Sequence, residues 1–224
     1  MQPFRPADLA QLAKEAATEG WASAATDYAR LRFAAQQLGW KPIEIRRRDG
    51  GVTDLAPTAP EHAHSASHSA RTGTRAQPLH TDGAHLRHPP QWVLLHAETP
   101  NATATRLRRL TTAPLAKPPA ASVPTAALGG LFLVNSGSER FLTELRTADA
   151  GWRWDPGCMT ACDQRARKAA EFLSDLEDQS HAHAWNEPNQ ALLIDNRNSL
   201  HARGDATDDP DRRLTRLTYR QPQP

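Results

Sequence analysis

The sequence PLHTDGAH, from Pro78 to His85, places two side chains that can bind a metal ion, His80 and Asp82, two residues apart. In an extended segment, residues i and i+2 project to the same side, so these two side chains can bind one ion together. An H-x-D pair alone is weak evidence, because the chain contains 10 histidines. A third donor is needed before this stretch predicts a metal centre.

The sequence LLIDNRNSLHAR, from Leu192 to Arg203, supplies that donor. An apolar strand ends there in polar residues, and His201 follows on what can be a neighbouring segment of the same barrel. Two histidines and one carboxylate are the smallest set that holds a mononuclear non-haem Fe(II) and leaves one face of the ion open. The sequence therefore predicts an Fe(II) site formed by His80, Asp82 and His201.

Two arginines follow the second histidine, Arg212 and Arg216. On an extended strand, residues i and i+4 face the same way, so both guanidinium groups can point into one cavity. The planar fork of arginine binds a carboxylate with two parallel hydrogen bonds, which a lysine cannot do. Thr103 follows the strand after the H-x-D pair, where its hydroxyl group can join the same carboxylate. These residues predict a dicarboxylate cosubstrate beside the metal.

In the rest of the chain, hydrophobic periodicity and turn residues predict a helical N-terminal part followed by mainly short strands. Helical periodicity covers residues 7–19, 25–38 and 163–178, and Asp163 is the expected N-cap of the last helix. Residues 56–78 and 99–126 are expected to be loops, except for a short basic piece at 106–110. The expected strands are 42–45 and 52–55, joined as a hairpin by Asp49-Gly50-Gly51, and then 92–97, 131–134, 151–154, 191–195 and 214–220.

No repeated βα unit is visible, so a mainly β fold, a jelly roll decorated by helices, fits best. We expect a single domain over residues 1–224. Residues 1–40 would form its helical N-terminal part, and residues 41–224 its jelly-roll core with a loop-rich insert at about 104–150.

Net charge argues against nucleic acid as a partner, and the cysteine content argues against a disulfide framework or a zinc site. Lys+Arg 27 against Asp+Glu 25 gives a net charge of only +2, which argues against nucleic acid as a partner. The cluster Arg46-Arg47-Arg48 is interpreted as a solvated strand end or turn. Cys158 and Cys162 have neither the number nor the spacing of a disulfide framework or a zinc site, so two reduced thiols are expected.

The N-terminal sequence lacks the apolar region of a signal peptide, and no apolar run approaches the length of a membrane span. The expectation is a soluble cytoplasmic protein without a membrane partner. The sequence does not determine the oligomeric state.

Taken together, PLHTDGAH, LLIDNRNSLHAR and DDPDRRLTR (Asp208–Arg216) resemble the taurine dioxygenase/clavaminate synthase-like family of Fe(II)- and 2-oxoglutarate-dependent oxygenases. RRRDGGVTDLAP, the Ser-rich stretch before His80 and WDPGCM (Trp154–Met159) extend the resemblance over roughly residues 38–220. The resemblance implies a double-stranded β-helix core with N-terminal and inserted helices. It also implies iron on His80, Asp82 and His201, with 2-oxoglutarate chelating that iron.

The same resemblance assigns roles around the metal. The distal carboxylate of 2-oxoglutarate would lie on Arg212 and Thr103, and Arg216 would lie near its keto-acid end. Arg203, in the H-x-R position, is expected to support the site structurally and is a candidate for contact with substrate. Apart from the resemblance, His85 lies near the expected site in the sequence, where contact with substrate and a surface position are both open. With a carboxylate at position 82, the resemblance implies hydroxylation of an unactivated C–H bond by O₂ or a related oxidation, and the sequence does not decide between hydroxylation, desaturation and ring formation. The expected substrate is a small molecule, an amino acid or a natural-product intermediate, and the co-products are succinate and CO₂.

Two alternatives remain open. The first is a jelly-roll protein that binds a metal or a small molecule without turnover. The second is a zinc-dependent hydrolase, which would have no use for Arg212 and Arg216. Basic residues at 71, 75, 106, 108 and 109 hint at an anionic or zwitterionic substrate, although solvated surface charge explains them equally well. Solvated positions are expected for the other histidines of the loop and of the chain after the third helix: His62, His64, His68, His181 and His183.

Overall fold

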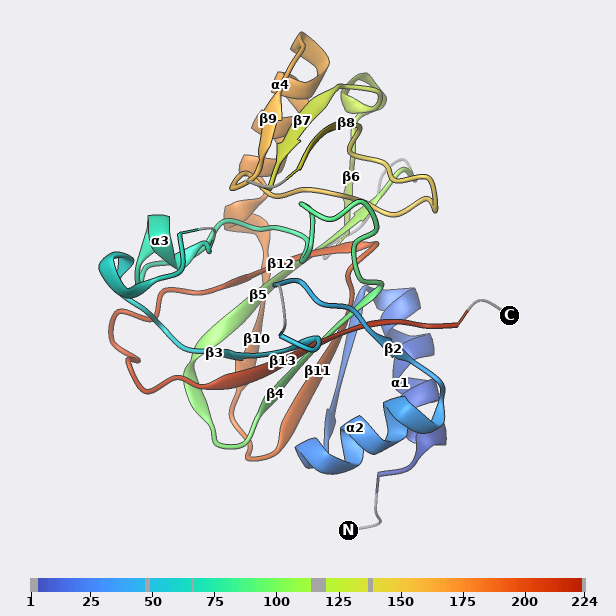
Figure 1. Ribbon diagram of the computed structural model, residues 1–224, viewed down its shortest axis with the longest axis vertical. Helices are drawn as coiled ribbons and strands as arrows, with labels where there is room; N and C mark the ends of the chain where they lie inside the picture. The colour runs from blue at the N-terminus through green and yellow to red at the C-terminus, as the bar shows by residue number, and fades with distance from the viewer. Residues whose placement is uncertain (1–3, 47–48, 66, 114–119, 137–138, 223–224) are drawn as a thin grey trace.

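The computed structural model describes residues 4–46, 49–65, 67–113, 120–136 and 139–222 (Figure 1). Its centre consists of two β-sheets packed face to face. The larger sheet has the strand order β1 (Trp21–Ala25), β11 (Gln190–Asp195), β4 (Trp92–Ala97), β13 (Leu214–Arg220) and β2 (Lys41–Pro42), and β3 (Val52–Leu55) also pairs with β13. The smaller sheet has the order β10 (His181–Trp185), β5 (Asn101–Thr111) and β12 (Ser199–Arg203), and β6 (Ala120–Ser122) runs parallel to β5.

The central strands are apolar on both faces because both faces are covered. In β4, Leu94 packs toward the N-terminal helices, whereas Leu95 packs between the two sheets. In β11, Leu193 packs toward the N-terminal helices and Leu192 packs between the two sheets. Since successive residues of a strand point to opposite faces, a continuous apolar run is what such a strand requires. The predicted strands at 92–97, 191–195 and 214–220 are confirmed.

Helices α1 (Pro6–Glu19) and α2 (Tyr28–Gln37) cover the outer face of the larger sheet (Figure 1). Both helices were predicted. Strand β1 lies between them and was not predicted, so the N-terminal part also adds an edge strand to the sheet. Gly20 makes the turn from α1 to β1 with φ 98°, and a Cβ atom there would lie 2.4 Å from Ser199 Oγ. This turn therefore requires glycine.

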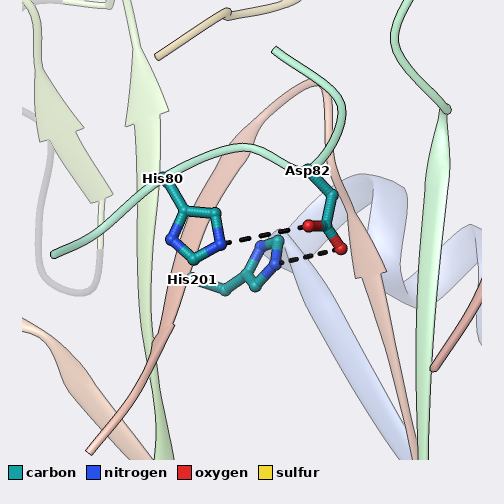
Figure 2. Close-up of side chains that lie close together, drawn as sticks. All are labelled: His80, Asp82 and His201. Atoms are coloured by element: carbon teal, nitrogen blue, oxygen red, sulfur yellow. Dashed lines mark ion pairs between the residues drawn. The ribbon is translucent and has the colours of Figure 1, made fainter. Parts of the chain in front are cut away.

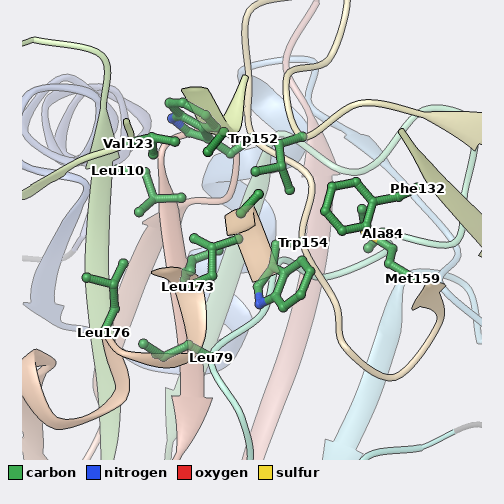
Figure 3. Packing of buried hydrophobic residues seen from close by; sticks show 14 of the residues in the cluster. Leu79, Ala84, Leu110, Val123, Phe132, Trp152, Trp154, Met159, Leu173 and Leu176 are labelled. Atoms are coloured by element: carbon green, nitrogen blue, oxygen red, sulfur yellow. The ribbon is translucent and has the colours of Figure 1, made fainter. Parts of the chain in front are cut away.

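A third layer covers the outer face of the smaller sheet. It consists of β7 (Phe132–Asn135), β8 (Arg140–Thr143), β9 (Met159–Ala161) and α4 (Gln164–Ser174). Asp163 caps α4 as predicted, because its side chain accepts a hydrogen bond from Ala166 N at 2.7 Å. Figure 3 shows the cluster beneath this layer, in which Leu173 and the two indoles of Trp152 and Trp154 pack near the sheet residue Leu110.

Three predictions of local structure are wrong. The loop expected at residues 99–126 is wrong over Asn101–Thr111, which form strand β5. Its polar residues hid it: Thr103 and Thr105 face inward and are hydrogen-bonded, while Arg106 and Arg108 reach the 3₁₀ turn η3 (Glu177–Gln179). Residues 151–154 contain only an isolated bridge between Trp152 and Arg146 rather than a strand.

The predicted hairpin between residues 42–45 and 52–55 is also wrong. β2 and β3 do not pair with each other, because both pair with β13. The remaining short elements are η1 (Pro60–His62), α3 (Ser69–Thr72) and η2 (Thr125–Ala127). Within the described ranges, no helix is both long and apolar enough to span a bilayer. A mainly β, jelly-roll architecture with N-terminal and inserted helices is confirmed.

Candidate metal centre

His80, Asp82 and His201 lie together on the inner side of the smaller sheet. His80 pairs with His201 as an antiparallel bridge, in which each backbone N–H donates to the other residue's carbonyl, at 3.0 and 2.9 Å. Residues directly opposite in such a pair project to the same side, so the two imidazoles are neighbours. Figure 2 shows both rings turned toward the Asp82 carboxylate, with His80 Nε2 3.9 Å from Oδ1 and His201 Nε2 3.6 Å from Oδ2. Across the described ranges, no other group of three such side chains brings its donor atoms within 4.8 Å.

The H-x-D segment is held from both sides. Thr81 points away from the two ligands, and its hydroxyl accepts a hydrogen bond from Trp154 N at 3.1 Å while its own N–H donates to Trp154 O at 2.7 Å. Asn196, at the end of β11, accepts from Asp82 N at 2.8 Å and donates to the carbonyls of Asp82 and Pro90 at 3.0 and 2.9 Å. Sequence analysis did not single out Asn196. Its one signal was a polar residue directly after an apolar strand.

The protonation states suit metal binding. His80 Nδ1 lies 2.9 Å from Pro78 O, which places the ring proton on Nδ1 and leaves the Nε2 lone pair toward Asp82. Burial lowers the pKa of His80 well below its ordinary value, and the charges of His68 and His201 add to this effect. Burial would raise the pKa of Asp82, but Arg216 and the two histidines outweigh it and hold that pKa below its ordinary value. Neutral imidazole and ionised carboxylate are the forms that bind a cation.

The residues present fit a metal ion. Asp82 Oδ2 is buried and accepts no hydrogen bond from the described residues. An ionised oxygen left in this state costs free energy that a bound cation would recover. Two imidazole nitrogens and one carboxylate are the donor set of Fe(II) sites that keep coordination positions open.

Both predicted arginines reach the same cavity. Arg216 lies on the inner face of β13, and its Nη1 donates to Asp82 Oδ1 at 2.8 Å. Arg212 precedes β13 and is 3% exposed, and its guanidinium lies 3.4 Å from Thr103 O and 3.4 Å from Thr105 Oγ1. Burial, together with the charge of Arg203, lowers the pKa of Arg212 to about 10. No carboxylate of the described residues lies within ion-pair distance of Arg212, so the group is suited to receive an anion.

Thr105, rather than Thr103, brings a hydroxyl group to this position. The Thr103 hydroxyl donates to Asp205 O at 3.3 Å, and its backbone N–H donates to Asp209 Oδ2 at 2.7 Å. Thr105 lines the cavity and accepts from Trp185 Nε1 at 3.0 Å as well as from Arg212. The predicted role of Thr103 stays a prediction. Thr105 is two residues further along the same strand and shares its inward face, which was the signal that sequence analysis missed.

The site opens into a cavity of about 1470 Å³. Both candidate substrate residues line this cavity. His85 Nε2 lies 3.1 Å from Ile45 O. Arg203 is buried, and its guanidinium donates to the carbonyls of Gly73 and Arg75, so in this structure it holds the wall of the cavity.

His68 is not solvated, contrary to prediction. Its ring centroid lies 4.1 Å from that of His80, and its Nε2 lies 3.4 Å from Asp155 Oδ1. The loop that carries it is therefore packed onto the metal site. His181 and His183 lie in strand β10, where His181 is exposed, as predicted, and stacks on Trp21, whereas His183 is partly buried.

The other basic residues divide into two groups. Arg71 lines the cavity and donates to Gly157 O, whereas Arg106 and Arg108 lie on the outward face of β5. Arg106 forms an ion pair with Glu177 at 2.8 Å, and Arg108 donates to Gln179 O at 2.7 Å. These two arginines hold η3 rather than the mouth of the cavity. Both cysteines are free, as predicted.

Neither the family models nor the curated proteins give a match to this chain. Solved structures do. An asparagine oxygenase in complex with Fe(II), 2S,3S-3-hydroxyasparagine and succinate superposes with a TM-score of 0.70 at 16% identity, covering 96% of this chain and 78% of that one. The non-haem iron oxygenase OrfP, in complex with Fe, succinate and (3S)-hydroxy-L-Arg, gives 0.68 at 18% identity and covers 96% and 79%.

PvcB, an Fe, α-ketoglutarate-dependent oxygenase from an isonitrile synthetic pathway, gives a TM-score of 0.62 at 17% identity. It covers 93% of this chain and 78% of its own. The chain thus has the jelly-roll fold of Fe/2-oxoglutarate-dependent oxygenases, as the sequence resemblance implied.

Proposed function

We propose that this protein is an Fe(II)- and 2-oxoglutarate-dependent dioxygenase that hydroxylates an unactivated C–H bond of a small molecule. The balanced reaction converts substrate, 2-oxoglutarate and O₂ into hydroxylated substrate, succinate and CO₂. One observation carries the proposal. A buried His80, Asp82 and His201 cluster shares a cavity with Arg212, a buried cation that has no carboxylate partner among the described residues.

The chain's own residues have separate tasks in this reaction. Bound Fe(II) would supply the activation of O₂ at the expense of 2-oxoglutarate. His80, Asp82 and His201 would hold the ion, and Arg216 keeps the Asp82 carboxylate ionised and oriented. Arg212 would bind the distal carboxylate of 2-oxoglutarate, with Thr105 fixing its guanidinium. No side chain needs to act as a general base.

The solved relatives support an amino acid or a related natural-product intermediate as substrate. The asparagine oxygenase structure holds 3-hydroxyasparagine with succinate, and the OrfP structure holds 3-hydroxyarginine with succinate. Succinate is the expected co-product of the proposed reaction. Both proteins share the fold at low identity, so the particular amino acid is not transferred from them.

The test is an anaerobic titration of the metal-free protein with Fe(II) and then 2-oxoglutarate. We expect a weak charge-transfer band at about 500 nm, the absorbance typical of an iron–keto-acid chelate. His201→Ala should lose both the bound iron and the band. Arg212→Ala should keep the iron and require much more 2-oxoglutarate, because it removes the cation that faces the distal carboxylate.

His181→Ala is the matched control. His181 lies in β10, the strand at the far end of the smaller sheet, and stacks on Trp21. This variant should behave as the wild type does. Iron bound by the wild type without a band would favour the alternative, a jelly-roll protein that binds a metal or a small molecule without turnover.

A further inference from the structure

The edge of the larger sheet is interrupted beside the metal centre. Pro42 of β2 lies opposite Tyr219, and Val52 of β3 lies opposite Leu217. Only Thr218 separates these two partners on β13, whereas the chain inserts residues 43–51 between Pro42 and Val52. Of the inserted residues that the structure describes, residues 44–46 line the wall of the cavity.

The described parts of this insert are held in place. Thr218 Oγ1 donates to Ile43 O at 2.6 Å, and Ile43 N donates to Thr218 O at 2.9 Å. The Asp49 carboxylate accepts from Arg46 N at 3.0 Å and from Gly51 N at 2.9 Å, which closes the insert on itself. These contacts fix the backbone of Arg46 at the rim of the cavity.

The Arg46 side chain lines the cavity together with Asp82 and Arg216. No carboxylate of the described residues lies within ion-pair distance of its guanidinium, which also forms no hydrogen bond with any of them. Arg46 is exposed at the rim; desolvation by the cavity wall and the charge of Arg216 lower the pKa of Arg46, whereas the carboxylates of Asp49 and Asp82 raise it. Arg46 and Arg216 therefore line the same cavity, and the charge of Asp82 acts on both guanidinium groups.

The other rim arginines already have partners. Arg87 forms an ion pair with Glu139 at 3.4 Å, and Arg71 donates to Gly157 O. Arg203 donates to backbone carbonyls of residues 73 and 75. Arg46 is thus the arginine of the described cavity wall whose side chain remains available to a ligand.

Charge balance points to the ligand, on the premise of the proposed function. Asp82 is already compensated by Arg216 and by the metal ion, and the distal carboxylate of 2-oxoglutarate by Arg212. The Arg46 side chain has no ion-pair partner among the described residues, and a planar guanidinium matches a carboxylate through two parallel hydrogen bonds. We propose that Arg46 binds a carboxylate of the substrate, so that the substrate class is free carboxylic acids, such as unblocked amino acids, rather than their amides or peptide-linked forms.

The experiment measures binding rather than turnover. Anaerobic protein loaded with Fe(II) and 2-oxoglutarate is titrated with each of the common L-amino acids and with the corresponding C-terminal amides, by calorimetry and by the change in the visible band. At least one free acid should bind, and its amide should bind about tenfold more weakly or worse, because the amide loses one charge-assisted contact. Arg46→Gln should weaken binding of the acid by a similar factor and leave binding of the amide and of 2-oxoglutarate unchanged.

Arg87→Gln is the control, because it removes a rim arginine that is already paired. It should bind the acid as the wild type does. The proposal is overturned if acid and amide bind equally, if Arg46→Gln retains wild-type affinity for the acid, or if no free acid in the panel binds. Absence of the band in the wild type would instead overturn the oxygenase itself, so the two failures are distinguishable.

Discussion

At the scale of single residues, the two oxygens of Asp82 have different surroundings. Oδ1 accepts a hydrogen bond from Arg216 at 2.8 Å, whereas Oδ2 is buried without a hydrogen bond from the described residues. Arg216 therefore keeps the carboxylate ionised and leaves one oxygen free for a cation. The H-x-D spacing predicted which residues meet here, because period two is a property of extended backbone. The spacing could not predict the hydrogen bond from Arg216 to Asp82, because that contact depends on the packing of the two sheets.

Thr105 gives a prediction about cosubstrate affinity. Thr105→Val keeps the shape of the side chain and removes the hydroxyl that accepts from Trp185 and Arg212. A net hydrogen bond of about 1 kcal/mol corresponds to roughly a fivefold increase in the Kd of 2-oxoglutarate, measured from the visible band. Binding of Fe(II) should not change, because the Thr105 hydroxyl forms no hydrogen bond with His80, Asp82 or His201.

Thr103→Val is the matched control on the same strand face. Its hydroxyl donates to Asp205 O, so this variant should lower stability slightly and leave 2-oxoglutarate affinity near the wild-type value. The opposite ranking of the two variants would assign the cosubstrate contact to Thr103, as the sequence resemblance implies.

At the scale of elements, the turn after β11 holds the metal-binding segment. Asn196→Ala would leave the N–H and carbonyl of Asp82 and the carbonyl of Pro90 without their partner. Buried polar groups in this state cost about 1–3 kcal/mol of unfolding free energy, which urea denaturation would measure. Because the side chain orients a ligand segment, Fe(II) affinity should also fall by about 10-fold or more.

Asn198→Ala tests whether that loss is specific. Asn198 lies in the same turn and donates to Asp195 Oδ2 at 2.8 Å, but it makes no hydrogen bond to the H-x-D segment. It should lower stability and leave Fe(II) affinity unchanged. Equal loss of iron in both variants would mean that the turn acts only through general stability.

Strand β10 gives a pH-dependent prediction. Burial against Trp185, with a smaller effect of His181, lowers the pKa of His183 from 6.5 to about 4. Between these values the unfolded chain binds a proton that the folded chain does not, so stability falls as the pH falls from about 6.5 to about 4. His183→Gln should make this decline shallower in urea unfolding at pH 7 and pH 4.5.

Helices and strands were predictable where a single hydrophobic pattern covered the whole segment. β4 and β11 are apolar on both faces, and α1 and α4 repeat at helical spacing, so each was predicted. β5 was missed because its inward threonines and outward arginines imitate a loop, although each of these four side chains makes at least one tertiary hydrogen bond. The hairpin of β2 and β3 was wrong because the sequence shows turn residues but not which neighbour each strand pairs with.

At the scale of the whole molecule, three buried hydrophobic clusters hold the layers of the fold together around the site. The N-terminal helices pack on the larger sheet, the two sheets pack on each other, and β7–β9 with α4 pack on the smaller sheet. The metal ligands come from the smaller sheet and the segment beside it, whereas Arg216 comes from the larger one. Folding of the two sheets against each other is therefore what assembles the centre, and metal binding is linked to the folding of the whole chain.

That linkage predicts a metal-dependent thermal stability. A ligand that binds only the folded state at about 100 times its Kd adds about 2.7 kcal/mol of stability. For a chain of this length, such a gain raises Tm by about 5–10 °C. Fe(II), or Co(II) as an air-stable probe, should produce this shift in the wild type under calorimetry. His201→Ala should be stable enough to measure without metal and should show no shift, because two donors remain. A full shift in His201→Ala would place the ion elsewhere, for example on His62 and His64 of the cavity wall.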